Sequence, residues 1–348
     1  MRNIISFIHD FGVIYLLLIF YLCWNILTFL LYGIDKQKAI KNKWRLSERL
    51  LLFFTWTLGS LGALLALMVF HHKKRKFKFK FSIFGGMILS LVFLIHLING
   101  LTFGRMIAFV EVDFTSPNWQ SEMDGYRIAF MTDFHAITDE DMADVIGQLN
   151  TLNLDLLLLG GDFSSDVWIG GNHFEGTLRE ISTVVTTDGV FGVEGNHDIY
   201  YRLFDVKNRY GIGVLDNSGN HIRPGFYVAG VHDLWNRTPD VAAAIYDSQA
   251  DDFVLLITHN PDVAMMQSTV GVDFILAGHT HGGQITFFGW PFYLLRQSVT
   301  NYGTRFSHGF NTSMDNVPIF NSRGVGPYYN WPRIFARPEV IIFTMYNE

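Results

Sequence analysis

The chain carries the sequence FILAGHTHGG at residues 274–283, a short apolar run that ends abruptly in two histidines. Four upstream runs of similar length also end in Asp, His or Asn. These four runs and the residues that follow them are Arg127–Thr132 with Asp133-Phe134-His135, Leu154–Leu159 with Gly160-Gly161-Asp162, Val190–Val193 with Gly195-Asn196-His197-Asp198, and Phe253–Thr258 with His259-Asn260-Pro261. Their length and their Leu-rich or β-branched content predict strands. Polar side chains therefore follow five successive strands.

Helical segments alternate with these strands. Residues 139–152, 174–185 and 261–269 have helical spacing or helix start signals. Alternating strands and helices predict a layered α/β fold, in which ligands gather beyond the carboxyl ends of the strands. Residues 114–124 are predicted to form a linker or loop. We therefore expect the five polar strand ends to build one site.

The residue types at these strand ends predict a dinuclear metal site. Oxygen and imidazole ligands without thiolate suit Mn, Fe or Zn and do not distinguish among them. Alternate residues of an extended D-x-H or H-x-H segment point the same way, so both can reach one cluster. Two metals about 4 Å apart can share a hydroxide and hold a phosphoryl oxygen for in-line attack. Taken singly, each motif also fits an ordinary turn, cap or bend, but five in register favour two divalent ions that act on a phosphoester.

The motifs D-x-H, G-D, G-N-H-D, H and G-H-T-H, in this order, resemble the calcineurin-like metallophosphoesterase superfamily over about residues 106–348. The resemblance implies a layered β-sandwich flanked by helices, and an enzyme that hydrolyses phosphoric esters. It implies one metal held by Asp133, His135, Asp162 and His281, and a second held by Asp162, Asn196, His259 and His279. Asp162 would bridge the two ions. His197 would be the catalytic residue beside the phosphate, as a proton donor to the leaving oxygen or a stabiliser of transition-state charge. Asp198 is given no catalytic role.

Three further strings resemble the bacterial membrane-associated phosphodiesterase branch of that superfamily: residues 278–285, 322–326 and 337–339. Some members of that branch cleave the pyrophosphate of a UDP-linked diacylated glucosamine. We therefore expect a phosphodiester or pyrophosphate substrate, which can be lipid-linked. Arg323 is a candidate phosphate ligand, with an ordinary surface Arg as the alternative. Residues 286–295 hold seven large apolar side chains around Trp290. They form either an apolar lip for a lipid substrate or a buried satellite cluster.

Charge and hydropathy divide the chain into residues 1–105 and 106–348. The first part holds 14 Lys and Arg against 3 Asp and Glu, whereas the second holds 12 against 29. An acidic catalytic part argues against nucleic acid as a partner. Residues 11–34, 50–70 and 81–104 contain no charged side chain and are each long enough to cross a membrane. The single cysteine, Cys23, excludes a disulfide scaffold. We expect a transmembrane region followed by a metallophosphoesterase domain, in a multi-pass protein of the cell membrane.

Both connectors between the apolar segments are basic, so the positive-inside rule conflicts with a full crossing by residues 50–70. Either one connector breaks the rule, or Gly59, Ser60 and Gly62 break the middle segment into a re-entrant hairpin. The basic residues before 81–104 place everything after that segment outside the cytoplasm. The pattern D-K-x-x-A, W-R-x-x-E, G-x-x-G-A and H-K, from Asp35 to Lys73, resembles a small uncharacterised family of bacterial membrane proteins.

Two other functions fit the same sequence. One is a membrane sensor or transport-associated protein that uses the phosphoesterase as its output. The other is a metal-binding scaffold without turnover, which is disfavoured because no expected ligand is missing.

Overall fold

The computed structural model describes residues 4–135, 137–163, 174–198, 209–291, 299–327 and 331–348. The chain divides into two compact units, Met1–Thr102 and Phe103–Glu348. We refer to them as the helical unit and the catalytic unit, and each is described by itself.

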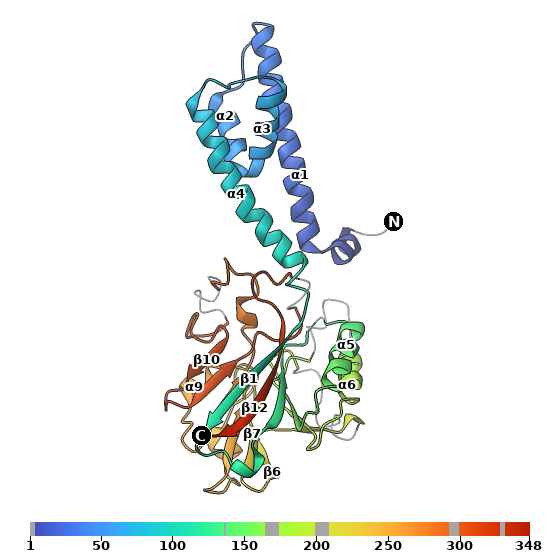
Figure 1. The fold of residues 1–348 in the computed structure, drawn as a ribbon, viewed down its shortest axis with the longest axis vertical. Helices are drawn as coiled ribbons and strands as arrows, with labels where there is room; N and C mark the ends of the chain where they lie inside the picture. The colour runs from blue at the N-terminus through green and yellow to red at the C-terminus, as the bar shows by residue number, and fades with distance from the viewer. Residues whose placement is uncertain (1–3, 136, 164–173, 199–208, 292–298, 328–330) are drawn as a thin grey trace. The chain divides into compact units, whose positions relative to one another are not determined.

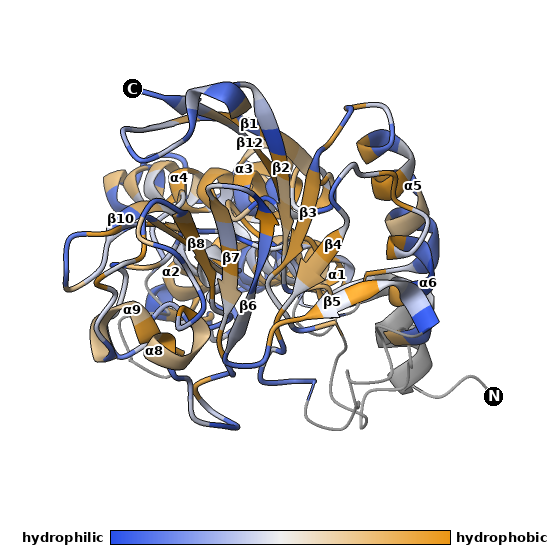
Figure 2. Ribbon diagram, turned by 90° about the horizontal axis from the view of Figure 1, so that it is seen from below, coloured by the Kyte–Doolittle hydropathy of each residue, from blue (hydrophilic) through white to orange (hydrophobic). Residues whose placement is uncertain are grey.

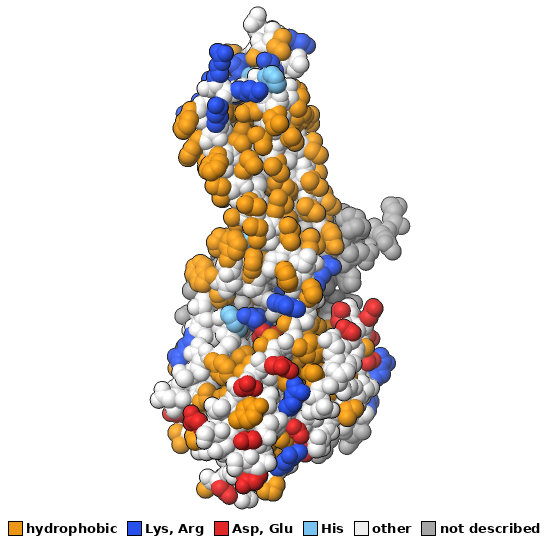
Figure 3. All heavy atoms as spheres, in the orientation of Figure 1, with side chains coloured by type: hydrophobic (Ala, Val, Ile, Leu, Met, Phe, Trp, Pro, Cys, Tyr) orange, Lys and Arg blue, Asp and Glu red, His pale blue; other side chains and the backbone are white. Residues whose placement is uncertain are grey.

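The helical unit consists of α1 (Ile4–Ile40), α2 (Glu48–Phe54), the π-helical turn η1 (Thr55–Gly59), α3 (Ser60–Val69) and α4 (Phe77–Leu101) (Figure 1). Three stretches are long and apolar enough to cross a membrane: Gly12–Ile40, Glu48–Val69 and Phe77–Leu101. Gly12, with φ of 65°, interrupts α1 where the first stretch begins. Apolar side chains cover the outside of this unit, and Lys and Arg gather at one end (Figure 3).

The middle stretch folds back on itself. A straight helix of 22 residues would be about 33 Å long. However, Glu48 at its start accepts hydrogen bonds from Lys73 Nζ at 2.7 Å and Lys76 Nζ at 2.6 Å, just beyond its end. The reversal lies in η1, where Leu58 has φ of 72°. Of the two alternatives the sequence left open, the structure has the hairpin, and both basic connectors lie at the same end of the unit.

Asn25 of α1 supports the tip of this hairpin. Its Nδ2 donates to the Leu58 carbonyl at 2.9 Å, and its Oδ1 accepts from the Gly62 N–H at 2.9 Å. A broken helix leaves backbone groups without intrahelical partners, which is costly in an apolar medium. Ser60 meets Ser90 of α4 at 2.9 Å on the other side. The tip thus lies against the middle of both long helices.

The catalytic unit contains two six-stranded sheets. The first has the order β1-β12-β2-β3-β4-β5, and the second has the order β10-β11-β9-β8-β7-β6. The strands of the first sheet are β1 (Ala108–Ser116), β2 (Tyr126–Met131), β3 (Leu156–Leu159), β4 (Val190–Gly192), β5 (Ile212–Val214) and β12 (Glu339–Asn347). Those of the second are β6 (Ser218–Arg223), β7 (Phe226–Gly230), β8 (Phe253–Ile257), β9 (Phe274–Ala277), β10 (Gly309–Thr312) and β11 (Pro318–Asn321).

The two sheets pack face to face, with helices on both outer faces (Figure 2). The central core includes Ile128 and Leu156 from the first sheet and Leu255 and Leu276 from the second. The helices α5 (Asp139–Leu149) and α6 (Phe174–Ile181) cover the outer face of the first sheet. The short helices α8 (Val241–Ala244) and α9 (Val263–Met266) cover the second. The predicted layered β-sandwich flanked by helices is confirmed.

Some element boundaries differ from those predicted. Residues 114–116 belong to β1, where they pair with β12, and residues 117–124 form a connection that contains the short 3-10 helix η2 (Ser121–Met123). The helix predicted over 261–269 shortens to Val263–Met266. The strands β1, β5, β6, β10 and β11 were not predicted. In β6, which lies at a sheet edge, the polar sequence has no apolar run to mark it.

Candidate metal centre

Five predicted strand ends meet at one edge of the sandwich. The strands β2, β3 and β4 run parallel in the first sheet, and β8 and β9 run parallel in the second. Parallel strands present their carboxyl ends at the same edge. The residues that follow those ends therefore converge, as the sequence predicts.

One group of side chains contains Asp133, His135 and His281, all buried, with ligand atoms that lie within 4.8 Å of one another. His135 Nε2 lies 3.0 Å from His281 Nε2, and His281 Nε2 lies 3.3 Å from Asp133 Oδ1. Three donor atoms facing a common point suit one metal ion.

A second group contains Asp162, His259 and His279, also buried and within the same limit. His279 Nδ1 lies 3.2 Å from His259 Nε2. The amide oxygen of Asn196 lies 3.1 Å from His259 Nε2, so Asn196 joins this group. The other ring nitrogen of His259 lies 2.7 Å from the Gly160 carbonyl, which orients the ring.

Asp162 connects the two groups. Its Oδ2 lies 3.3 Å from His135 Nε2 in the first group and 3.2 Å from His259 Nε2 in the second. This is the position that a bridging carboxylate requires. The structure thus brings together all seven predicted ligands.

The backbone at five of these residues is strained. Asp133, His135, Asp162, His279 and His281 have φ values of 56°, 40°, 57°, 71° and 52°. Non-glycine residues in this left-handed region cost on the order of 1–3 kcal/mol each, and such strain clusters at functional sites. The fold therefore holds these side chains in place against local preference.

Burial and mutual charge shift the protonation of the site. Burial by itself raises the pKa of Asp162, but the rings of His259 and His135 hold that pKa well below its usual range. Burial lowers the pKa of His259, but the carboxylates of Asp162 and Asp133 outweigh it and raise this pKa to about 10. Burial and the charge of His259 lower the pKa of His279 to about 3. Oxygen and nitrogen donors, buried and carrying charge, fit divalent metal ions, which would displace the shared protons.

Comparison with known proteins agrees with this geometry. Residues 126–283 match the family model described as calcineurin-like phosphoesterase. The chain contains a calcineurin-like metallophosphoesterase domain. Residues 25–79 match a separate family of unknown function, DUF1294, which agrees with the second resemblance of the sequence.

Three relatives illustrate the match. An uncharacterized metallophosphoesterase of Helicobacter pylori (strain 26695) is 27% identical over 229 residues, which are 62% of this chain and 58% of that protein. The phosphodiesterase YaeI of Escherichia coli is 28% identical, over 63% of this chain and 82% of that protein. A transmembrane protein with metallophosphoesterase domain of Danio rerio is 23% identical, over 66% of this chain and 55% of that protein. The chain thus spans just over half the length of the Helicobacter relative.

His197 lies beside the two groups of ligands. Its backbone N–H donates to Asp162 Oδ1 at 2.8 Å, and its ring centroid lies 5.1 Å from that of His135. His197 and Asn196 are half-buried, whereas the six histidines and aspartates of the two groups are buried. His197 is thus less buried than the aspartates and histidines of the two groups.

Asp198 organises the loops beneath the site. Its carboxylate accepts N–H bonds from Asp162 and Gly195 at 2.8 Å and from Phe163 at 2.9 Å. These bonds fix the turn that carries Asp162 against the turn that carries Asn196. This agrees with a supporting position outside the metal ligands.

Arg333 is a supporting residue that the sequence reasoning missed. Its side chain is fully buried, with Nη2 at 3.1 Å from His281 Nδ1 and Nη1 donating to the Arg323 carbonyl at 2.6 Å. Burial lowers its pKa to about 10. Arg333 lies between the strings 322–326 and 337–339 and belongs to neither, so no local sequence pattern marked it.

The two candidate substrate-binding residues, Arg323 and Trp290, have different surroundings. Arg323 donates from Nη1 to Glu339 Oε2 at 2.7 Å, so its charge is already balanced. Trp290 is 56% exposed, and Phe287 and Phe288 beside it are exposed to a similar degree. Residues 292–295 of the same apolar string lie outside the described residues. The half of the string that is described is thus an exposed aromatic surface and not a buried cluster.

The loop after β7 lies beside the second group of ligands, a position that the sequence analysis did not predict. The ring of Trp235 meets that of His279 edge-on, with centroids 4.6 Å apart. Asn236 Nδ2 donates to the Asn196 carbonyl at 2.6 Å. The residues after His232-Asp233 therefore border the second group of ligands.

Proposed function

We propose that the protein is a membrane-anchored two-metal phosphoesterase that hydrolyses a phosphodiester or pyrophosphate bond. The observation that carries this proposal is the position of Asp162, which faces both groups of histidines and holds the half-exposed His197 next to them.

The geometry and the family resemblance both support two sets of metal ligands. Asp133, His135, Asp162 and His281 would hold one ion, and Asp162, Asn196, His259 and His279 would hold the other. When bound, two such ions polarise a phosphoryl oxygen and supply a nucleophilic hydroxide at neutral pH. The donor set suits Mn, Fe or Zn.

The chain itself supplies proton transfer and orientation. His197 lies within reach of a phosphate bound over the two groups, and its ring N–H would donate a proton to the leaving oxygen. General acid work of this kind contributes about 10²- to 10⁴-fold to the rate. Asp162 positions this residue through the backbone bond described above. A scaffold without turnover would have no use for an imidazole on the solvent side of the ligands.

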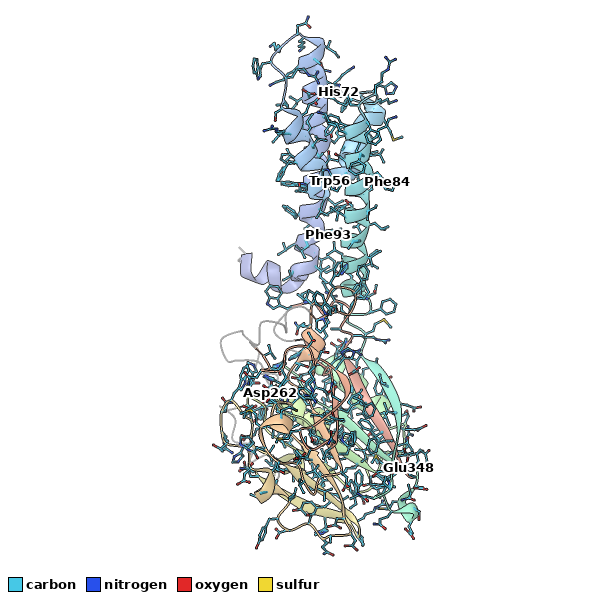
Figure 4. All side chains as sticks on the ribbon, turned by 90° about the vertical axis from the view of Figure 1, so that its left-hand side faces the viewer. Trp56, His72, Phe84, Phe93, Asp262 and Glu348 are labelled. Carbon is cyan, nitrogen blue, oxygen red and sulfur yellow. The ribbon has the colours of Figure 1, made fainter. Side chains whose placement is uncertain are left out.

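The charge pattern favours a catalytic unit outside the cytoplasm. Both basic connectors lie at one end of the helical unit, where Figure 4 labels His72, while Phe93 of α4 lies toward the other end. By the positive-inside rule the basic end faces the cytoplasm. The helix α4 then carries the chain outward. We therefore propose a multi-pass membrane protein with two full crossings and one re-entrant hairpin.

We further propose that the substrate is lipid-linked. Phe287, Phe288 and Trp290 form an exposed aromatic surface, which we call the lip. The lip is joined to the ligands through Gly283, where an added Cβ would lie 2.5 Å from Pro291 Cβ. Only six residues separate Leu101 of α4 from Ala108 of β1, a tether of at most about 25 Å. If the acyl chain of a lipid substrate packs against the lip, the phosphate of the same lipid stays free to bind at the metal ligands.

Replacing the lip tests the lipid link. The variant with Phe287, Phe288 and Trp290 changed to Ser should lose hydrolysis of lipid phosphodiesters in detergent micelles about 10-fold or more, because apolar burial favours the acyl chain. It should keep activity on bis(p-nitrophenyl) phosphate. A matched control changes the exposed Val185, Met266 and Val270 to Ser and should affect neither substrate. Equal loss on both substrates in the lip variant would indicate a structural role and contradict the lipid link.

A further inference from the structure

The helical unit contains a pocket at the basic end of α1. Its volume is about 430 Å³, and it is lined by Leu30, Gly33, Ile34, Gln37, Lys38, Lys41, Lys43 and Phe70. The lining divides into two kinds of residue. Apolar residues line it along α1, and three lysines line it where α1 ends.

The apolar wall is built by close packing. Gly33 faces the ring of Phe70, and a Cβ on Gly33 would lie 3.0 Å from two carbons of that ring. Phe70 also packs on Phe29, with ring centroids 5.0 Å apart. Leu30 and Ile34 remain 52% and 45% exposed. The wall is therefore an open apolar groove next to a fixed aromatic ring.

Lys38, Lys41 and Lys43 form no salt bridge among the described residues, whereas Arg45, Lys73, Lys76 and Lys78 each pair with an acid. Asp35 is buried and binds Arg45 at 2.6 Å and His72 at 2.7 Å. Glu48 forms salt bridges with Lys73, Lys76 and Lys78. Among the described residues, no carboxylate lies within 4.0 Å of Lys38, Lys41 or Lys43. Asp35 and Glu48, the nearest acids in sequence, are thus committed elsewhere, and the pocket keeps an uncompensated positive charge.

The pocket extends along α1 over a length that matches one half of a lipid bilayer. Leu30 to Ile40 spans about 15 Å along a helix, which is half of a hydrocarbon core of about 30 Å. Trp44, between Lys43 and Arg45, is 93% exposed. Trp side chains favour the membrane–water interface, and lysines next to a membrane helix attract anionic headgroups. The lysines would thus lie at headgroup depth, and the apolar wall would lie at acyl depth.

We propose that this pocket binds an anionic phospholipid, with its phosphate on Lys38, Lys41 and Lys43 and one acyl chain along Leu30, Ile34 and Phe70. The charge complementarity selects an anion, and the apolar wall selects a lipid over free phosphate. This site is separate from the metal ligands and does not rest on the proposed phosphoesterase activity. It assigns a binding role to the DUF1294 part of the chain.

Native mass spectrometry of the full chain tests this proposal. The protein is released from detergent micelles doped with phosphatidylglycerol or phosphatidylcholine, and retained lipid is counted per chain. The variant K38Q/K41Q/K43Q should retain phosphatidylglycerol about 10-fold less than the wild type. The matched control K74Q/R75Q/K80Q removes the same charge from exposed residues of the second connector and should retain it as the wild type does. Equal thermal unfolding temperatures of the two variants would show that both are folded.

Two further arms identify the ligand. Ile34→Trp should fill the acyl groove and weaken lipid retention while leaving the lysines in place. Glycerol phosphate, which lacks acyl chains, should not displace phosphatidylglycerol. Equal lipid loss in the two charge variants would show general attraction to the basic end and overturn the proposal. So would equal retention of the two lipids, or displacement by glycerol phosphate.

Discussion

His197 is the one predicted catalytic side chain that lies among the ligands without being needed to hold a metal. We assign it to the phosphate, because it is only partly buried beside the ligands and its backbone N–H bonds to Asp162. His197→Ala should therefore keep the metal content of the wild type and lose turnover by about 10²- to 10⁴-fold. Metal analysis checks the expected metal content, and steady-state kinetics on the same preparation checks the expected loss of turnover. Unchanged turnover on a diester with a poor leaving group would remove His197 from the mechanism.

Asp198 shows how a single carboxylate can support the site from below. Asp198→Ala would leave three buried N–H groups without an acceptor, each costing about 1–3 kcal/mol. We expect the free energy of unfolding of the metallophosphoesterase domain to fall by about 3 kcal/mol or more. Thermal unfolding of the variant measures this loss. Asp144→Ala on the exposed face of α5 is the control, and a loss no larger than that of the control would refute this role for Asp198.

At the scale of elements, the DUF1294 motif residues have structural partners. Gly62 packs directly on α1, and a Cβ at this position would lie 2.0 Å from the Asn25 carbonyl oxygen. Gly62→Ala should therefore push the hairpin away from α1 and cost about 1–3 kcal/mol of stability. The measurement is the unfolding temperature of the full chain in detergent. Leu61→Ala, at an exposed neighbour, should have little effect, and equal effects would mean that the close approach is not needed.

The sequence predicted the site better than it predicted the sheets. Four of the five strands that precede ligands are buried, largely apolar runs followed by Asp, His, Gly or Asn, and such a run can be recognised from its own residues. The fifth, β4, is short and only partly buried. The strand β6 is paired only at the sheet edge, and its polar residues give no period to detect. The buried side chain of Arg333 contacts His281, which lies 52 residues earlier in the sequence. Contacts of that kind depend on tertiary packing, which no local pattern encodes.

The hairpin was predictable in kind but not in detail. The charge conflict between the two basic connectors left a hairpin as one of two alternatives for residues 50–70, and Gly59, Ser60 and Gly62 marked where such a hairpin would turn. The part played by Asn25 could not be predicted, because it lies in another helix and bonds to Leu58 and Gly62 only after the two segments have packed.

For the whole molecule, the arrangement of charges predicts a topology. If both basic connectors face the cytoplasm, as we propose, the unit Phe103–Glu348 would lie outside the cytoplasm. Protease added to intact cells, or to spheroplasts where an outer membrane is present, should degrade this unit and leave a fragment that contains the helical unit. A cytoplasmic marker protein should remain intact as the control. Protection of the catalytic unit until lysis would reverse the orientation.

The central claim is that two metal ions share Asp162, and the number of metals bound per chain tests it most directly. Purified full-length protein, loaded with Mn, Fe or Zn and freed of excess ion, should hold two metals per chain by elemental analysis. His135→Ala removes a ligand from one ion only and should leave about one, because the set around His259 stays complete. Asp162→Ala removes a ligand from both ions and should leave almost none. Two metals bound to folded Asp162→Ala protein, or a single metal in the wild type, would contradict the account.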